Sequence, residues 1–247
     1  MEETRKKEKI KACIAISVIV LAILITGIIS IKYYVEGETN MPFTLSKITV
    51  VSTAEGIENK DSTEKWNLSV FQNNDIYFSI EKNENNKQEE IIESISIENI
   101  QVIENPKVGT IKTYMPNSSD GRLFSYSDEY VVKENKLTYR GGSKSNSKTL
   151  EIGNQGGTII ARISNTEVGK YISNNDEVKH DGSLIKEIGV QKEDISFKIS
   201  FDVVINLKNT SYISNIILDL PCQDDLLEVG TCSKEITDNF VFKRVIN

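Results

Sequence analysis

The chain has 247 residues, of which 38% are hydrophobic, and its formal net charge is −7. Its first eleven residues carry a charge of +2, which leaves −9 on the remainder. An acidic body repels the phosphate backbone of nucleic acids, so the charge argues against a DNA- or RNA-binding protein. The length allows one or two domains.

An uncharged apolar segment near the N-terminus, residues 13–31, is predicted to be a transmembrane helix. A helix of this length spans about 28 Å, close to the ~30 Å hydrocarbon core of a bilayer. The alternative is a cleaved signal peptide, whose apolar region is typically about 7–15 residues long and ends at an A-x-A-like site. The longer segment and the poor match to such a site near Gly37 favour a retained helix.

Basic residues are distributed unevenly around this segment. Five Lys or Arg precede it, whereas only Lys32 follows it closely. The positive-inside bias therefore predicts a single-pass cell-membrane protein with a cytoplasmic N-terminus and an extracytoplasmic C-terminus. In this interpretation residues 1–12 are a cytoplasmic leader, 13–31 the membrane helix, 32–42 a juxtamembrane linker and 43–247 an extracytoplasmic β region.

The first half of the body shows the period-two alternation of apolar and polar residues that is typical of strands. Residues 43–52 form one such run. Residues 66–70 and 76–80 form two more, and Asn73-Asn74-Asp75 between them predicts the turn of a hairpin. Residues 91–103 alternate with a slip of one residue near Asn99, which predicts a β-bulge.

The second half of the body continues the pattern. The clearest strand is residues 196–207, with six apolar residues at strict period two, followed by a turn at 208–211 and a returning strand at 212–220. Shorter runs are also predicted as strands: residues 130–133, 137–140, 149–152, 158–164 and 234–245.

Many short strands without a long helix beyond the N-terminal one predict an all-β fold, a two-sheet antiparallel sandwich behind a single transmembrane helix. The pattern does not choose between one large sandwich and two small ones. If there are two, we expect the seam at residues 106–109, where Pro106 and Gly109 interrupt the chain.

Two cysteines lie in the body, Cys222 and Cys232. Outside the cytoplasm such a pair is a candidate disulfide. Two free thiols are the alternative, because spacing alone does not establish the Cα separation of about 5.5–6 Å that a disulfide needs.

A candidate catalytic set consists of His180, Cys232 and Arg244. Their order behind a single N-terminal anchor, together with the dipeptide Thr231-Cys232, resembles the sortases, which are membrane-anchored cysteine transpeptidases. The resemblance implies Cys232 as nucleophile, His180 as acid/base and Arg244 as oxyanion stabiliser. The chemistry requires these three side chains to converge, which order along the chain does not establish.

Neither a metal ion nor a cofactor is expected. Asp224, Asp225 and Glu228 offer oxygen ligands for Ca²⁺, but they lack EF-hand spacing, and short acidic loops are commonly just solvated. Zinc would need a further cysteine pair or a histidine cluster, whereas His180 is the single histidine.

The layout of an anchor followed by β structure, with a composition rich in Ile, Asn, Lys, Glu and Ser, resembles single-pass envelope proteins of clostridia and related low-GC bacteria. That resemblance implies no particular activity and no site residues. The first hypothesis is a binding or structural module that offers loops or an edge strand to an envelope protein or glycan. A cysteine transpeptidase is the second, and an assembly subunit of a membrane complex, with an exposed apolar patch, is the third.

Overall fold

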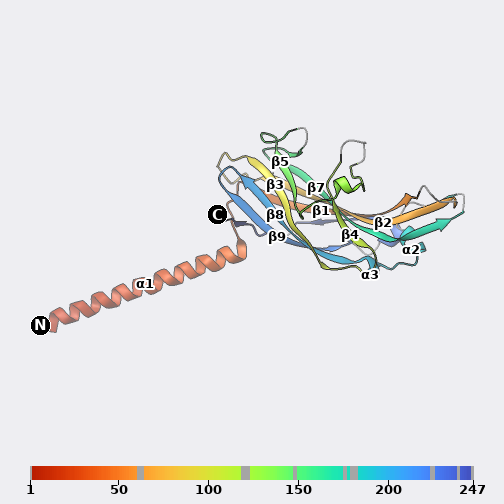
Figure 1. Ribbon diagram of the computed structural model, residues 1–247. Coiled ribbons are helices and arrows are strands. Elements are labelled where there is room, and N and C mark those ends of the chain that lie inside the picture. Colours follow the sequence, from red (N-terminus) through yellow and green to blue (C-terminus); the bar gives the residue numbers. More distant parts are fainter. Residues whose placement is uncertain are drawn as a thin grey trace.

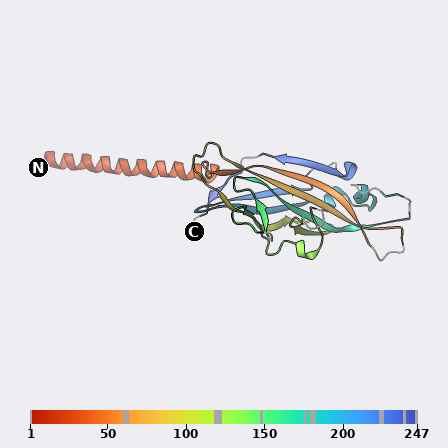
Figure 2. The same cartoon turned by 90° about the horizontal axis from the view of Figure 1, so that it is seen from above.

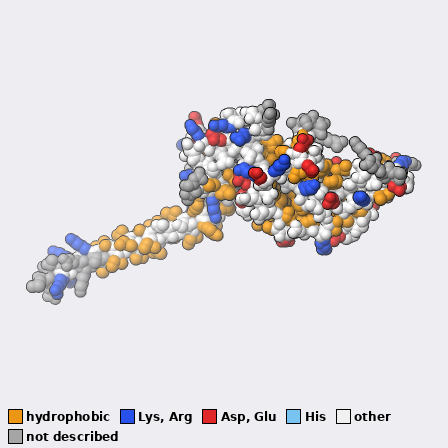
Figure 3. Space-filling view, viewed as in Figure 1, with side chains coloured by type: hydrophobic (Ala, Val, Ile, Leu, Met, Phe, Trp, Pro, Cys, Tyr) orange, Lys and Arg blue, Asp and Glu red, His pale blue; other side chains and the backbone are white. Residues whose placement is uncertain are grey.

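The computed structural model describes residues 2–59, 64–117, 123–146, 149–174, 177–178, 183–222, 226–237 and 240–245. A long helix, α1 (Glu2–Glu36), projects from an elongated β-stranded body (Figures 1 and 2). Within it, Cys13–Glu36 is long and apolar enough to cross a membrane, and this span includes the predicted residues 13–31. Hydrophobic side chains cover the helix, and basic side chains gather near its free end (Figure 3).

The body consists of two sheets, which confirms the predicted two-sheet sandwich behind an N-terminal helix. The strand order is β10-β1-β2-β7-β4 in the first sheet and β11-β9-β8-β3-β5-β6 in the second. Neighbouring strands are antiparallel except β5 and β6, which are parallel. The strands are β1 (Phe43–Glu58), β2 (Trp66–Lys82), β3 (Ile92–Glu104), β4 (Thr110–Tyr114), β5 (Leu137–Gly141), β6 (Leu150–Ile152), β7 (Gly157–Ser173), β8 (Phe197–Leu207), β9 (Ser211–Leu220), β10 (Thr231–Ile236) and β11 (Lys243–Arg244).

Helices in the body are short. They are η1 (Asp128–Tyr130), α2 (Ser183–Glu187), α3 (Lys192–Ile195) and α4 (Leu226–Val229). The last three lie toward the end of the body that is remote from α1, where α2 and α4 pack against the first sheet (Figure 1).

The alternating pattern is reliable where it is longest. β8 and β9 form the predicted hairpin, with Asn206 opposite Ser211, and the apolar residues of β8 point into the sandwich. The predicted bulge in β3 is also confirmed, because the register shifts between Glu98 and Gln101 and Asn99 has a φ of 53°.

The predicted hairpin at Asn73-Asn74-Asp75 is wrong. β2 runs without interruption through these residues, from Trp66 to Lys82. Asn73 and Asn74 are fully buried, and side chains of β1 and β7 supply their hydrogen-bond partners. Residues with strong turn preferences can therefore lie inside a strand, because tertiary contacts outweigh local preference.

Two further strand predictions differ from the structure. Residues 130–133 contribute only the end of η1 and an isolated bridge from Val131 to Tyr114. Residues 234–245 are not one strand, because β10 belongs to the first sheet and β11 to the second. A single continuous strand would keep both segments in one sheet.

The described residues form two large apolar clusters, besides a small one of Tyr114, Phe124 and Ile160. The larger, here called the anchor-side core, includes Phe43, Phe78 and Phe201, and the smaller, the distal core, includes Leu68, Leu184 and Leu226. β1, β2 and β7 contribute to both clusters. Residues 106–109, where a seam was expected if the body had two modules, connect β3 of the second sheet to β4 of the first.

Candidate functional site

A groove of about 590 Å³ lies on the open side of the sandwich, between β9 of the second sheet and β10 of the first. Its surface is mainly polar, with apolar contributions from the exposed Ile217 and the half-buried Phe240, whereas the side chains of Val50, Ile216 and Leu218 beneath it belong to the anchor-side core. The groove lies between two strands that each end a sheet, apart from the short β11.

The edge of β9 along this groove is largely unpaired within the described residues. β8 pairs with β9 along its whole length, whereas on the other side β11 pairs with Tyr212 and Ile213 and the Val245 N–H donates to the carbonyl of Ser211. Residues 214–220 are left with no described strand beside them. An edge of this kind presents backbone N–H and C=O groups that another strand can bind.

Charged side chains surround the groove. Asp219 and Glu235 are already paired, with Lys198 at 3.4 Å and Lys47 at 2.9 Å. Lys234 occupies a position on β10 opposite Val50, where side chains point inward, yet its side chain is exposed. Lys234 therefore contributes a positive charge to the lining of the groove.

Cys222 and Cys232 meet beside this groove. Cys222 follows β9, Cys232 lies on β10, and their Sγ atoms are 3.4 Å apart. The Cys222 N–H donates to Oγ of Ser52 at 3.0 Å, and Ser52 is the residue opposite Cys232 in the sheet. No disulfide joins them in this structure, because a disulfide bond is about 2.05 Å long. The disulfide stays a prediction, but the structure brings the pair together.

The sortase-like set is not brought together. Arg244 lies at the anchor end, where its N–H donates to Oη of Tyr33 and its guanidinium is 3.7 Å from Glu38. Arg244 pairs with Tyr212, whereas the cysteine pair adjoins the other end of β9, about 27 Å away at ~3.4 Å per residue. His180 lies outside the described residues.

No metal site is present among the residues that the structure describes, where no group of three His, Cys, Asp or Glu is arranged to hold an ion. Asp224 and Asp225 of the acidic loop lie outside those residues. Glu228 is described, and its carboxylate accepts a hydrogen bond from Lys186 at 2.7 Å.

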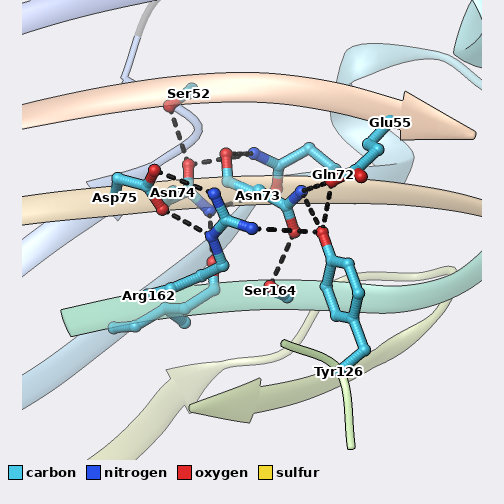
Figure 4. A network of polar contacts seen from close by, with 10 residues as sticks. Ser52, Glu55, Gln72, Asn73, Asn74, Asp75, Tyr126, Arg162 and Ser164 are labelled. Carbon is cyan, nitrogen blue, oxygen red and sulfur yellow. Dashed lines mark hydrogen bonds and ion pairs between the residues drawn. The ribbon is translucent and has the colours of Figure 1, made fainter. Parts of the chain in front are cut away.

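A layer of polar side chains separates the two cores on the inner face of the first sheet. We call Ser52, Gln72 and Asn74 the inner polar layer (Figure 4). Oδ1 of Asn74 accepts hydrogen bonds from Ser52 at 2.7 Å and from Gln72 at 2.9 Å. Val50 and Ala54 flank this layer on β1 and belong to different cores, so the layer divides the interior along the strands.

A second set of polar groups lies on the outer face of the same strands, here called the outer polar cluster: Glu55, Asn73, Asp75, Tyr126, Arg162 and Ser164 (Figure 4). Arg162 binds Asp75 with two hydrogen bonds, of 2.6 and 2.9 Å, and its guanidinium lies 4.4 Å from the ring centroid of Phe124. The hydroxyl of Tyr126 donates to Glu55 at 2.6 Å.

Burial and neighbouring charges shift the pKa values of Tyr126 and Arg162 in this cluster. Burial raises the pKa of Tyr126, so its hydroxyl keeps its proton and donates to Glu55. Burial by itself would lower the pKa of Arg162, but its hydrogen bonds to Asp75 and the nearby negative charge raise it overall. The contacts of the cluster link β1, β2, β7 and the loop of Tyr126.

Sequence reasoning missed both polar sets because it interpreted Asn73-Asn74-Asp75 as a turn. One signal was present. Leu68, Val70, Ile76, Phe78 and Ile80 are all even-numbered, so the apolar phase continues unbroken across the polar residues, as it does in a single strand.

Comparisons with known proteins give no relative. No protein-family model matches the chain, and no curated protein or solved structure matches it significantly. The anchor, the groove and the thiol pair are therefore the features from which a function can be proposed.

Proposed function

We propose that this chain is a membrane-tethered binding module of a bacterial cell envelope. In this proposal α1 crosses the membrane once with its N-terminus in the cytoplasm. The sandwich lies on the outer side and binds an extended segment of an envelope partner in the groove beside β9. The observation that carries the proposal is the combination of an unburied apolar helix with an open strand edge.

The anchor supports the membrane part of the proposal. The body has its own closed cores, and none of the apolar window of α1 is buried against it. About a dozen Ile, Val and Leu residues each favour insertion by roughly 0.3–0.6 kcal/mol at the membrane centre, and no charge opposes them. The five basic residues before the apolar segment support the orientation.

Contacts at the end of α1 support a tether that is joined to the sandwich rather than separated from it by a long linker. The Glu38 N–H donates to the carbonyl of Phe242 at 2.7 Å, and the ammonium of Lys243 lies 4.3 Å from the ring centroid of Tyr34. The last turn of the helix is thus bound to the segment that contains β11.

The groove supports the binding part. An extended segment that paired with residues 214–220 of β9 would lie on the same side of β9 as β11, in line with it. It would provide hydrogen-bond partners for the open backbone groups of β9. The exposed Ile217 and the half-buried Phe240 would contact alternate side chains of that segment, because successive residues of a strand point to opposite faces. The occupant is therefore an extended peptide with apolar residues at every second position and a carboxylate near Lys234.

The anchor and its orientation can be tested with two fusions to the C-terminus. Alkaline phosphatase should be active, green fluorescent protein should be dark, and the chain should stay in membranes after alkaline carbonate extraction. Leu21→Arg combined with Ile25→Arg costs about 5–7 kcal/mol of insertion energy and should release the chain, whereas the matched Ala pair should not. The reverse pattern of fusion activity, or extraction of the unmodified chain, would overturn the tether.

The groove can be tested with a phage-displayed peptide library selected on the full-length chain in detergent. The selected peptides should alternate apolar and polar residues and carry an Asp or Glu. Lys234→Glu should abolish their binding, whereas Lys208→Glu, in the β8–β9 turn, should leave it unchanged. The alternative is that Lys234 only prevents the edge strand from pairing with another copy of the chain. In that case Lys234→Glu would leave peptide binding intact, and the groove would not be the binding site.

A further inference from the structure

We propose that Cys222 and Cys232 form a thiol–disulfide exchange site that fastens the two sheets together beside the groove. Cys222 continues from β9 of the second sheet, and Cys232 belongs to β10 of the first. A bond between them would therefore cross the open side of the sandwich. This inference does not depend on the tether or on a peptide ligand.

The two sulfur atoms are already positioned for reaction. Their separation of 3.4 Å must shorten by about 1.4 Å to reach the ~2.05 Å of a disulfide, a change that side-chain rotation can supply. The backbone of Cys222 is held by its N–H donating to Ser52, and Sγ of Cys222 lies 3.7 Å from the carbonyl oxygen of Val50. These contacts hold Cys222 beside Cys232.

The two cysteines differ in access, and this difference sets the order of reaction. Cys222 is half-buried and lines the groove, whereas Cys232 is only 6% exposed and belongs to the distal core. A disulfide reagent from solvent, small-molecule or protein, can reach Cys222 first. Cys232 is then the resolving cysteine.

The exchange proceeds in two steps. The thiolate of Cys222 attacks one sulfur of the external disulfide, which forms a mixed disulfide and releases one thiol. The thiolate of Cys232 then attacks Sγ of Cys222, which forms the internal disulfide and releases the second thiol. The two protons lost by the cysteines are taken up by the two released thiolates, and the external disulfide is the species that is reduced.

The closed bond should stabilise the folded body. It closes a short loop that includes α4, and in the chain-entropy model this restricts the unfolded chain enough to raise the melting temperature by roughly 5–10 °C for a protein of this size. Reduction should reverse the change.

The test uses the purified full-length chain in detergent with Cys13→Ser, so that the pair contains the only thiols. Oxidised glutathione should lower the intact mass by two hydrogens and leave no adduct. Cys232→Ser should accumulate a glutathione adduct on Cys222, and Cys222→Ser should react at least tenfold more slowly. A persistent adduct in the chain with both cysteines, two unreacted thiols, or equal rates for the single variants would overturn the proposal.

A second measurement covers the case in which a serine variant fails to fold. In the Cys13→Ser chain, brief treatment with a maleimide followed by peptide mapping should label Cys222 before Cys232. Preferential labelling of Cys232 would overturn the assigned order. Because both measurements are made on purified protein without a peptide ligand, their failure leaves the tether and the groove proposals standing.

Discussion

Replacing Asn74 with alanine should destabilise the body strongly, because this side chain links the inner polar layer. It is fully buried and takes part in four hydrogen bonds. Its Oδ1 accepts from Ser52 at 2.7 Å and Gln72 at 2.9 Å, and its Nδ2 donates to Gln72 at 3.2 Å and to the carbonyl of Ile163 at 3.1 Å.

Truncation leaves three buried neighbours without these partners. At about 1 kcal/mol for each buried group that loses its hydrogen-bond partner, the free energy of unfolding should fall by about 3 kcal/mol. For a body of this size that corresponds to a melting temperature lower by roughly 6–12 °C.

Circular dichroism of the detergent-solubilised chain during urea and thermal unfolding measures this loss through the β signal of the body. The matched control is Asn105→Ala, since the side chain of Asn105 is exposed, and it should change stability by less than about 0.5 kcal/mol. If Asn74→Ala also lost less than about 1 kcal/mol, the inner polar layer would not be a buried hydrogen-bonded network, and the reasoning would be refuted.

Three other perturbations test the outer polar cluster and the join to the anchor. Arg162→Met leaves the half-buried Asp75 without its cation and should lower the unfolding free energy by about 3 kcal/mol in urea titrations; a loss below about 1 kcal/mol would mean that water replaces the pair. Because the pKa of Tyr126 is raised in the folded chain, this tyrosine contributes stability below about pH 10 that is lost as the pH rises further. Between about pH 9 and pH 11, the unfolding free energy of the Tyr126→Phe variant should therefore fall less than that of the unmodified chain. Equal falls in the two proteins would contradict this. Gly37→Ala introduces a Cβ 2.3 Å from the carbonyl oxygen of Phe242 at a φ of 71°, and should lower the unfolding free energy by about 2 kcal/mol; an unchanged melting temperature would contradict that close approach.

Most elements of the fold could be predicted from local pattern. The apolar helix, the β8–β9 hairpin and the bulge at Asn99 each depend on residues close together in the chain, and all three are present. The prediction failed at Asn73 and Asn74, because residues that favour turns when exposed are accommodated in a strand when other strands supply their hydrogen-bond partners.

The candidate site could be predicted only in part. Cys222 and Cys232 were identified as a pair because two cysteines ten residues apart share one region of the chain. The groove was not identified, because whether a strand lies at the edge of a sheet depends on the order of strands in that sheet. The local sequence of a strand does not give this order. The grouping of Cys232 with Arg244 relied on order along the chain, and β9 separates the two in space.

By itself, the sequence determined which segments alternate, which segment suits a bilayer, and that the body is acidic, since these properties depend only on the composition and spacing of nearby residues. The tertiary structure decided which backbone edge stays open and which polar side chains are buried. It also decided that Ser52 contacts Cys222, 170 residues away, and that Tyr33 contacts Arg244, 211 residues away. Such contacts depend on strand order and register, which follow from packing two sheets against each other and not from any local preference of the chain.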